Sequence, residues 1–195
     1  MIKALLFIFE PGMTWDKIVQ ARRSLQWVLF LYLMPMVAIS VAGELYGLLR
    51  WGKPSEQLLE EVAPISHQMA VYYGLAQFFV SLAVVFVGAK LVKSLAETFH
   101  SRHTFPQCFT LAAYTLSPLF LVRLFDVFPK MNPWVTLGIG VLLSLTVLYQ
   151  GVPRILQPDP PHAFGLYLMS ALLLAIVSGL GRCLTLLGLH GKLRF

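Results

Sequence analysis

The chain has 195 residues, of which 57% are hydrophobic and only 12% are charged. Because a globular domain carries about 25% charged residues, this composition excludes an ordinary soluble protein. The formal net charge is +6, which in a soluble protein would suggest nucleic-acid binding. In an apolar chain, basic residues usually flank membrane spans and face anionic lipid. We therefore expect no nucleic-acid partner.

The N-terminal segment before the first span is expected to form a short helix. Thr14 can cap this helix after the Pro11-Gly12 turn, and one face at helical spacing would hold Trp15, Ile18, Val19 and Arg22. This pattern is typical of a helix that lies in the membrane interface with a Trp anchor. A plain cytoplasmic extension of the first span is the alternative.

Five long apolar stretches make up most of the remaining chain. A helix needs about 20 apolar residues to span the hydrocarbon layer of a bilayer. The predicted spans are residues 25–49, 69–92, 105–128, 133–156 and 163–189. We therefore predict an all-α, polytopic integral membrane protein with a single membrane domain, in which residues 1–24 form a cytoplasmic or interfacial segment and residues 25–189 form a five-helix bundle.

The basic residues near the ends of the predicted spans indicate an orientation, because such residues usually stay in the cytoplasm. Those on the same side as the N-terminus are Lys3, Lys17, Arg22, Arg23, Lys90, Lys93, Arg102 and Arg154. The opposite side holds fewer basic residues in its connections, and the first of these connections also carries Glu56, Glu60 and Glu61. We predict a cytoplasmic N-terminus and an extracytoplasmic C-terminus.

Four charged residues lie inside predicted spans: Glu44, Arg123, Asp126 and Arg182. An unpaired charge at the bilayer centre costs at least about 2.5–3.5 kcal/mol. Because the spans alternate in direction, all four residues are expected at a similar depth near the outer side, and Arg123 and Asp126 are close enough in sequence to pair. They form a predicted polar cluster that could serve as a substrate or ion site. The interpretation we favour is that these side chains either extend to the lipid head groups or hold helices together.

The third predicted span contains the sequence Tyr114-Thr115-Leu116-Ser117-Pro118. Proline removes an internal hydrogen bond and kinks a helix. The hydroxyl groups of Tyr114 and Ser117 can then bond freed carbonyls or a neighbouring helix. A structural kink at Pro118 is favoured over a hinge or cavity.

Small residues predict close helix contacts in the first and fifth spans. They are spaced four residues apart and comprise Gly43, Gly47, Ala171, Ala175 and Gly179. In lipid, such residues let helix backbones approach each other. The pattern does not distinguish contacts inside one chain from contacts in a homodimer.

The sequence contains no pattern typical of an enzyme or a metal site. It has no H-E-x-x-H, G-x-S-x-G, P-loop or C-x-x-C motif. Three histidines, His100, His103 and His162, are expected on one side of the membrane, but the linking Ser101-Arg102 is polar and basic and only Glu97 is nearby. We predict a protein that is not an enzyme and holds no metal or cofactor.

Several segments resemble the membrane domain of the Yip family (Ypt-interacting proteins): FPQC at 105–108, AAYTLSPLFL at 112–121 and LYQGVP at 148–153. The segment PGMTWDKI at 11–18 is similar to the start of compact bacterial members. The resemblance implies five membrane helices, a cytoplasmic N-terminus, an inner-membrane location and no catalytic residues. Eukaryotic members are tied to trafficking and Rab-type GTPases, but this chain departs from them because it lacks their Asp-Leu-Tyr-Gly-Pro motif.

Two functions follow as expectations. The first is a non-enzymatic membrane protein that organises membrane or protein partners through helix contacts, with the lipid bilayer, other membrane proteins or a second copy as its partners. The alternative is a small transporter or channel whose polar site is formed by Glu44, Arg123, Asp126 and Arg182. A lipid-acting membrane enzyme has no specific feature in its favour.

Overall fold

The computed structural model describes residues 11–21, 23–52, 66–99, 103–128 and 131–189, which are almost entirely helical and contain no strand. The elements in chain order are α2 (Pro11–Ala21), α3 (Leu25–Trp27), the π-helix η1 (Val28–Leu33), α4 (Met34–Trp51), α5 (His67–Thr98), α6 (Phe105–Thr115), α7 (Ser117–Val122), the 3-10 helix η2 (Arg123–Val127), α8 (Pro133–Ile155) and α9 (Pro160–Leu189).

Five helical runs are long and apolar enough to cross a membrane. They are Leu25–Trp51, His67–Thr98, Phe105–Val127, Pro133–Ile155 and Pro160–Leu189. These runs coincide with the five stretches expected from the sequence, so the all-α, five-span prediction is confirmed. The hydrophobic runs located the spans because the bilayer requires long helices whose backbone groups are satisfied within the segment.

Polar side chains cap the helices where the spans begin. Ser66 accepts a hydrogen bond from the Met69 backbone nitrogen at 3.2 Å, and Asn132 accepts one from Trp134 at 2.8 Å. Thr104 forms a capping box with Gln107 at the start of α6. These caps satisfy backbone N–H groups that a helix leaves free at its first turn.

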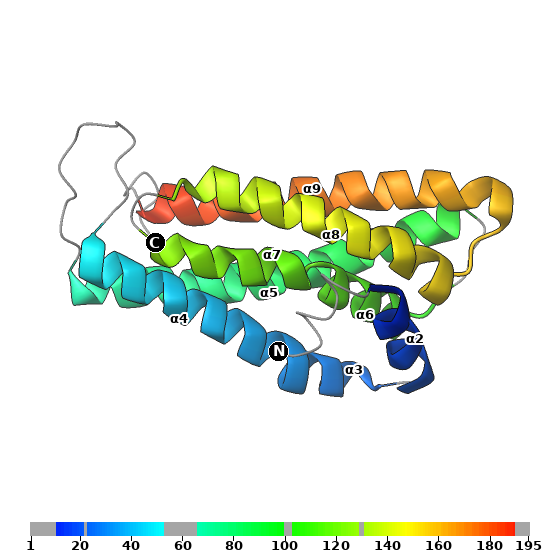
Figure 1. Cartoon of the computed structure of the whole chain (residues 1–195), viewed down its shortest axis with the longest axis horizontal. Coiled ribbons are helices and arrows are strands. Elements are labelled where there is room, and N and C mark those ends of the chain that lie inside the picture. Colours follow the sequence, from blue (N-terminus) through cyan, green and yellow to red (C-terminus); the bar gives the residue numbers. More distant parts are fainter. Residues whose placement is uncertain (1–10, 22, 53–65, 100–102, 129–130, 190–195) are drawn as a thin grey trace.

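The third span, formed by α6, α7 and η2, is the core of the bundle. Its apolar window is 78% buried, whereas the window of the fifth span, α9, is 28% buried. α5 packs against α4, α6 and α9, and α8 packs against α6, α7 and α9. Figure 1 shows α7 running between α4 and α8. The first, second and fourth spans therefore pack around the third, α9 packs against α5 and α8, and all four present more of their surface to lipid than the third span does.

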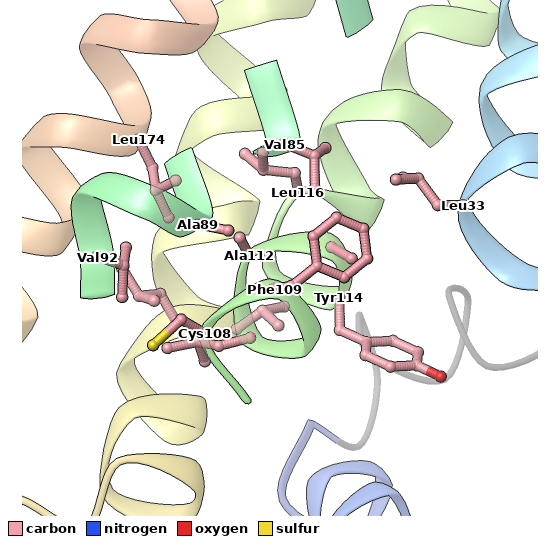
Figure 2. Close-up of a cluster of buried hydrophobic side chains, with 14 of the residues drawn as sticks. Leu33, Val85, Ala89, Val92, Cys108, Phe109, Ala112, Tyr114, Leu116 and Leu174 are labelled. Carbon is pink, nitrogen blue, oxygen red and sulfur yellow. The ribbon is translucent and has the colours of Figure 1, made fainter. Parts of the chain in front are cut away.

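The hydrophobic core includes the place where the third span packs against α5. Figure 2 shows Cys108, Phe109 and Ala112 facing Ala89 and Val92, and all five residues have no exposed surface. The alanines at the crossing let the two backbones approach, and the larger side chains fill the space beside them. This arrangement fixes the third span firmly against its neighbour.

Two spans are interrupted at proline residues. α6 ends at Thr115 and α7 begins at Ser117, so the break in the third span falls directly before Pro118. In the first span a π-helical segment runs from Val28 to Leu33, and Pro35 follows in the first turn of α4. Because proline has no backbone N–H, it disrupts the regular hydrogen-bond ladder at both places.

The short N-terminal helix is present as α2, but its Trp15 faces protein and not lipid. Trp15 is fully buried, and its indole nitrogen donates to the Val147 carbonyl oxygen at 2.9 Å. A Cβ atom at Gly151 would lie 2.6 Å from the Trp15 ring, so α8 offers a socket that only glycine leaves open. The helix also begins at Pro11, which places Thr14 inside it instead of at its cap.

The expectation of a lipid-facing Trp anchor is therefore wrong. Helical periodicity identifies an apolar face, but it does not say whether lipid or protein covers that face. Figure 1 shows α2 lying across one end of the bundle, beside α6 and α8.

Candidate functional site

The four predicted intramembrane charges meet at one end of the bundle, where α4 and α9 end. Arg182 on α9 lies between two carboxylates: its Nη1 is 2.8 Å from Glu44 Oε1, and its Nη2 is 2.7 Å from Asp126 Oδ2. Arg123 Nη2 lies 3.7 Å from Glu44 Oε2. We call Glu44, Arg123, Asp126 and Arg182 the charge network. It connects the first, third and fifth spans.

The pairing inside the charge network differs from the local pair suggested by sequence spacing. Within the described residues, no ion pair joins Arg123 to Asp126, although they are three residues apart. Arg123 Nη1 donates instead to Ser81 Oγ at 3.3 Å, and Asp126 accepts from Thr136 Oγ1 at 2.6 Å. Both side chains lie in the packed interior of the bundle. Side chains of neighbouring helices are therefore within reach, and they take the place of the local i,i+3 pair.

Two neutral residues of α5 complete the environment of Glu44. The Tyr73 hydroxyl donates to Glu44 Oε1 at 2.6 Å, and Gln77 Nε2 donates to Glu44 Oε2 at 3.0 Å. The sequence reasoning did not single out either residue. Their spacing of four places them on one face of α5, and a glutamine inside an apolar stretch is the signal that would have identified them.

The charge network is deeply buried and has no net formal charge. Side-chain exposure is 2% for Arg182, 4% for Asp126, 6% for Glu44 and 9% for Arg123. Two arginines and two carboxylates balance each other, as buried charges must because an isolated ion in a low-dielectric interior is very costly. With Thr136 and the α5 side chains, these contacts tie together α4, α5, η2, α8 and α9.

Two small cavities adjoin the charge network. The first, of about 20 Å³, lies among α5, α7, η2, α8 and α9. Its polar lining residues are Gln77, Ser81, Arg123, Ser178, Arg182 and Thr185, and the rest of its lining is apolar. The second is also about 20 Å³ and is lined by Glu44, Asp126 and Arg182, with Gly52 and Leu189 from the ends of α4 and α9. Each has space for a molecule the size of water.

The residues of the predicted kink join the first and third spans. The Tyr32 hydroxyl lies 2.6 Å from Ser117 Oγ, and Ser117 Oγ in turn donates to the Ala113 carbonyl at 3.1 Å. The ring of Tyr114 lies 4.2 Å from that of Tyr32 between centroids, and 6.1 Å from that of Trp15. The side chains around Pro118 thus bond and pack against their neighbours, which fits a structural kink.

The glycines of the first span pack inside the chain against η2. A Cβ atom at Gly47 would lie 2.7 Å from the Val127 carbonyl oxygen, and one at Gly43 would lie 3.1 Å from Leu124. These contacts explain the small residues without a homodimer. They also bring α4 close enough to η2 for Glu44 to reach Arg123.

The small residues of the fifth span behave differently from the expectation. Ala171 is 6% exposed and Ala175 is half-buried, but no described atom lies within 4 Å of a Cβ built at Gly179. Gly181 makes the close contact instead, because its Cβ would lie 2.5 Å from Val84 of α5. The row of small residues at four-residue spacing therefore faces away from the bundle at Gly179. The expected contact there is absent from the described chain.

Two of the three histidines singled out in the sequence, His103 and His162, lie in the described residues. His100 lies outside the described residues, and the ring of His162 packs edge-on against Phe99 at 6.1 Å. Over the described ranges, no group of three or more His, Cys, Asp or Glu residues is placed to hold a metal ion.

These features define a class: an all-α, multi-pass membrane protein whose spans are joined by a buried, charge-balanced network. A comparison with protein families matches residues 5–181 to the Yip1 domain. The match covers nearly the whole chain, so the chain belongs to the Yip1 domain family, as the sequence resemblance implied. A comparison with curated proteins and one with solved structures each gave no match.

Proposed function

We propose that this protein is a non-enzymatic, single-domain membrane protein that organises protein partners, or further copies of itself, through contacts of its helices. The observation that carries the proposal is the pairing inside the charge network. Arg182 bonds the carboxylates of Glu44 and Asp126 at 2.7–2.8 Å. The charged side chains therefore hold the bundle together and neutralise one another. The surface left for recognition is the outward side of the spans.

The outward side of α9 supports contact with another helix. A Cβ at Gly179 would meet no described atom within 4 Å, while Leu180 and Leu184 beside it are 60% and 49% exposed. Because glycine has no side chain, a second helix backbone can approach closely at this outward position. Contacts of this kind require no catalytic group.

Native mass spectrometry of the protein extracted in a mild detergent or in native lipid discs tests the proposal. We expect a homo-oligomer or a co-purified membrane partner, which Gly179→Leu separates because the added side chain blocks the close approach of a second helix backbone. Leu180→Phe, which changes bulk at a neighbouring exposed position, is the matched control and should preserve the assembly. A clean monomer under gentle extraction would count decisively against the proposal.

For the location we propose an inner (plasma) membrane, with the N-terminus in the cytoplasm and the C-terminus outside. The support comes from exposed or half-buried basic residues toward the α2 end of the bundle, comprising Lys17, Arg23, Lys90, Lys93 and Arg154. Basic residues are retained on the cytoplasmic side. Reporter tags at both termini should report opposite compartments, and reports from one compartment would refute this orientation.

A small transporter or channel is the second candidate, favoured by the two cavities that adjoin Arg182. This function requires the cavities to widen and join around the charge network. Flux through proteoliposomes that is lost in Asp126→Asn would favour it. No flux across a panel of ions and small solutes would remove it.

A further inference from the structure

The first cavity beside the charge network has the properties of a binding site for one small polar molecule. Its volume is about 20 Å³, and Gln77, Arg123, Ser178 and Arg182 are among the residues that line it. A cavity needs about 10–15 Å³ of this kind of volume to hold one water molecule. The space therefore admits a water molecule and excludes larger solutes.

Each of those four residues has a buried polar atom without a protein partner. The atoms are Gln77 Oε1, Arg123 Nε, Ser178 Oγ and Arg182 Nε, and none has a hydrogen-bond partner within the described part of the chain. The residues are only 1%, 7%, 4% and 3% exposed, in the same order. Because buried polar groups are nearly always hydrogen-bonded, four residues that line one cavity and each carry such an atom point to a partner inside it.

The donors and acceptors identify the chemistry of that partner. The two guanidinium Nε–H groups only donate, Gln77 Oε1 only accepts, and the Ser178 hydroxyl does either. The orientation of the Gln77 amide is set by its Nε2, which donates to Glu44 Oε2 at 3.0 Å. The site therefore needs a molecule that both accepts and donates.

Water meets this need, whereas simple ions do not. One water molecule can accept from the two guanidinium groups and donate to Gln77 Oε1 and Ser178 Oγ. A halide has no hydrogen to offer Gln77 Oε1, and it would also add a negative charge to a network that is already balanced. A metal cation would lie against two arginine side chains, which repel it.

We propose that this cavity binds one ordered water molecule that completes the charge network. The water joins Gln77 on α5, Arg123 on η2, and Ser178 and Arg182 on α9. With this water in place, the Nε–H groups of Arg123 and Arg182 also have a hydrogen-bond partner, and the charge network includes a buried water. This site is separate from the helix contacts of the proposed function, so either proposal can fail alone.

Millisecond X-ray footprinting of the protein in lipid discs tests the proposal, because radicals formed from bound water oxidise the side chains beside it. Phe120 lines the cavity and is 1% exposed, whereas Phe109 in the same span is 0% exposed and packs against Phe86. We expect Phe120 to be oxidised several-fold faster than Phe109. Equal rates would overturn the proposal, because they would mean that the cavity is dry.

A matched pair of variants places the water. Ser178→Val removes a hydrogen-bonding partner and fills the space, so it should lower Phe120 oxidation to the Phe109 rate. Ser144→Val makes the same change at another buried serine, on α8, and should leave the rate unchanged. If Ser178→Val does not fold, the wild-type comparison of Phe120 with Phe109 still decides the question.

Ion replacement separates water from an ion. Repeating the footprinting with bromide for chloride and rubidium for sodium should not change the rate at Phe120. A rate that depends on either ion would mean that an ion occupies the site, and this result would contradict the proposal.

Discussion

The two ends of the bundle hold their helices together by different means. At the end where α4 and α9 finish, the contacts are ion pairs between Arg182, Glu44 and Asp126 at 2.7–2.8 Å. At the opposite end, where α2 lies, the buried contacts are aromatic packing and single neutral hydrogen bonds, such as that from Trp15 to the Val147 carbonyl, and the ion pair between Arg154 and Asp16 is exposed. Figure 1 shows the end of α9 and helix α2 at opposite ends of the molecule.

This difference has a physical consequence for how each end fails. A buried charge that loses its partner remains in a low-dielectric interior, so a defect in the charge network spreads to every helix that contributes to it. A neutral side chain that is removed leaves a cavity but no uncompensated charge. We therefore expect global loss of folding at the charged end and local undocking at the α2 end.

The largest effect is expected from Arg182→Leu. This change leaves Glu44 and Asp126 without their shared cation, and breaking a buried ion pair in this way costs about 3–5 kcal/mol. Folded yield after mild extraction, measured by fluorescence-detected gel filtration, should fall strongly. Arg50→Leu, the same change at an exposed position in the last turn of α4, is the control and should keep a normal yield. Equal yields for the two variants would remove the contrast between a buried and an exposed charge.

Trp15→Ala should release α2 and leave the rest of the bundle folded. Trp15 is fully buried in the socket at Gly151, and truncating a buried tryptophan costs about 3–5 kcal/mol. That cost falls on the docking of one short helix, so trypsin should cut after the exposed Lys17 much faster while gel-filtration yield stays near normal. Val19→Ala changes a side chain of α2 that is 39% exposed and should not alter the cleavage rate. Global unfolding of Trp15→Ala would contradict the local role of α2.

A smaller effect is expected from Ser117→Ala at the proline kink. The change removes the hydrogen bond of 2.6 Å to the Tyr32 hydroxyl. Hydrogen bonds between membrane helices contribute about 0.6–1.7 kcal/mol in double-mutant cycles, and a cycle with Tyr32→Phe should give a coupling in this range. The comparison variant is Thr110→Ala, whose hydroxyl bonds only its own helix at the Pro106 carbonyl. Zero coupling between Ser117 and Tyr32 would show that this bond does not join the spans.

The smallest effect is expected from Arg154→Gln. Arg154 pairs with Asp16 of α2 at 2.9 Å, but the side chains are 34% and 57% exposed. Exposed ion pairs contribute about 0.2–1 kcal/mol and weaken in salt. Cleavage after Lys17 should rise slightly at low salt and match the wild type at high salt. A large effect that persists at high salt would mean that this pair, and not Trp15, fixes α2.

The sequence was sufficient for the spans and for the shared level of the four charged residues along the bundle, because span length and hydrophobicity determine both. Counting residues from the membrane surface placed Glu44 and Arg182 at one level, and the structure brings them to 2.8 Å. It was not sufficient for the partners. Whether Asp126 bonds Arg123 or Arg182 depends on the rotation of each helix about its axis, which packing of the whole bundle decides.

The same limit explains the other differences. Trp15 and Gly179 belong to patterns that identify a face of a helix, but not what covers it. Trp15 is covered by α8, whereas Gly179 faces outward and Gly181 makes the close contact with α5. The sequence does not draw attention to Tyr73 and Gln77, because a buried neutral polar group costs much less free energy than a buried charge. Their presence in an apolar span therefore stands out less than that of a charged residue.

The four charges of the charge network stabilise the fold by pairing with one another. The most direct test is the folded yield of Asp126→Asn combined with Arg182→Leu, compared with Arg182→Leu alone. The double variant removes one charge of each sign and leaves Arg123 beside Glu44 at 3.7 Å, so it should recover much of the lost yield. A double variant that folds no better than Arg182→Leu alone would show that charge balance does not stabilise this bundle.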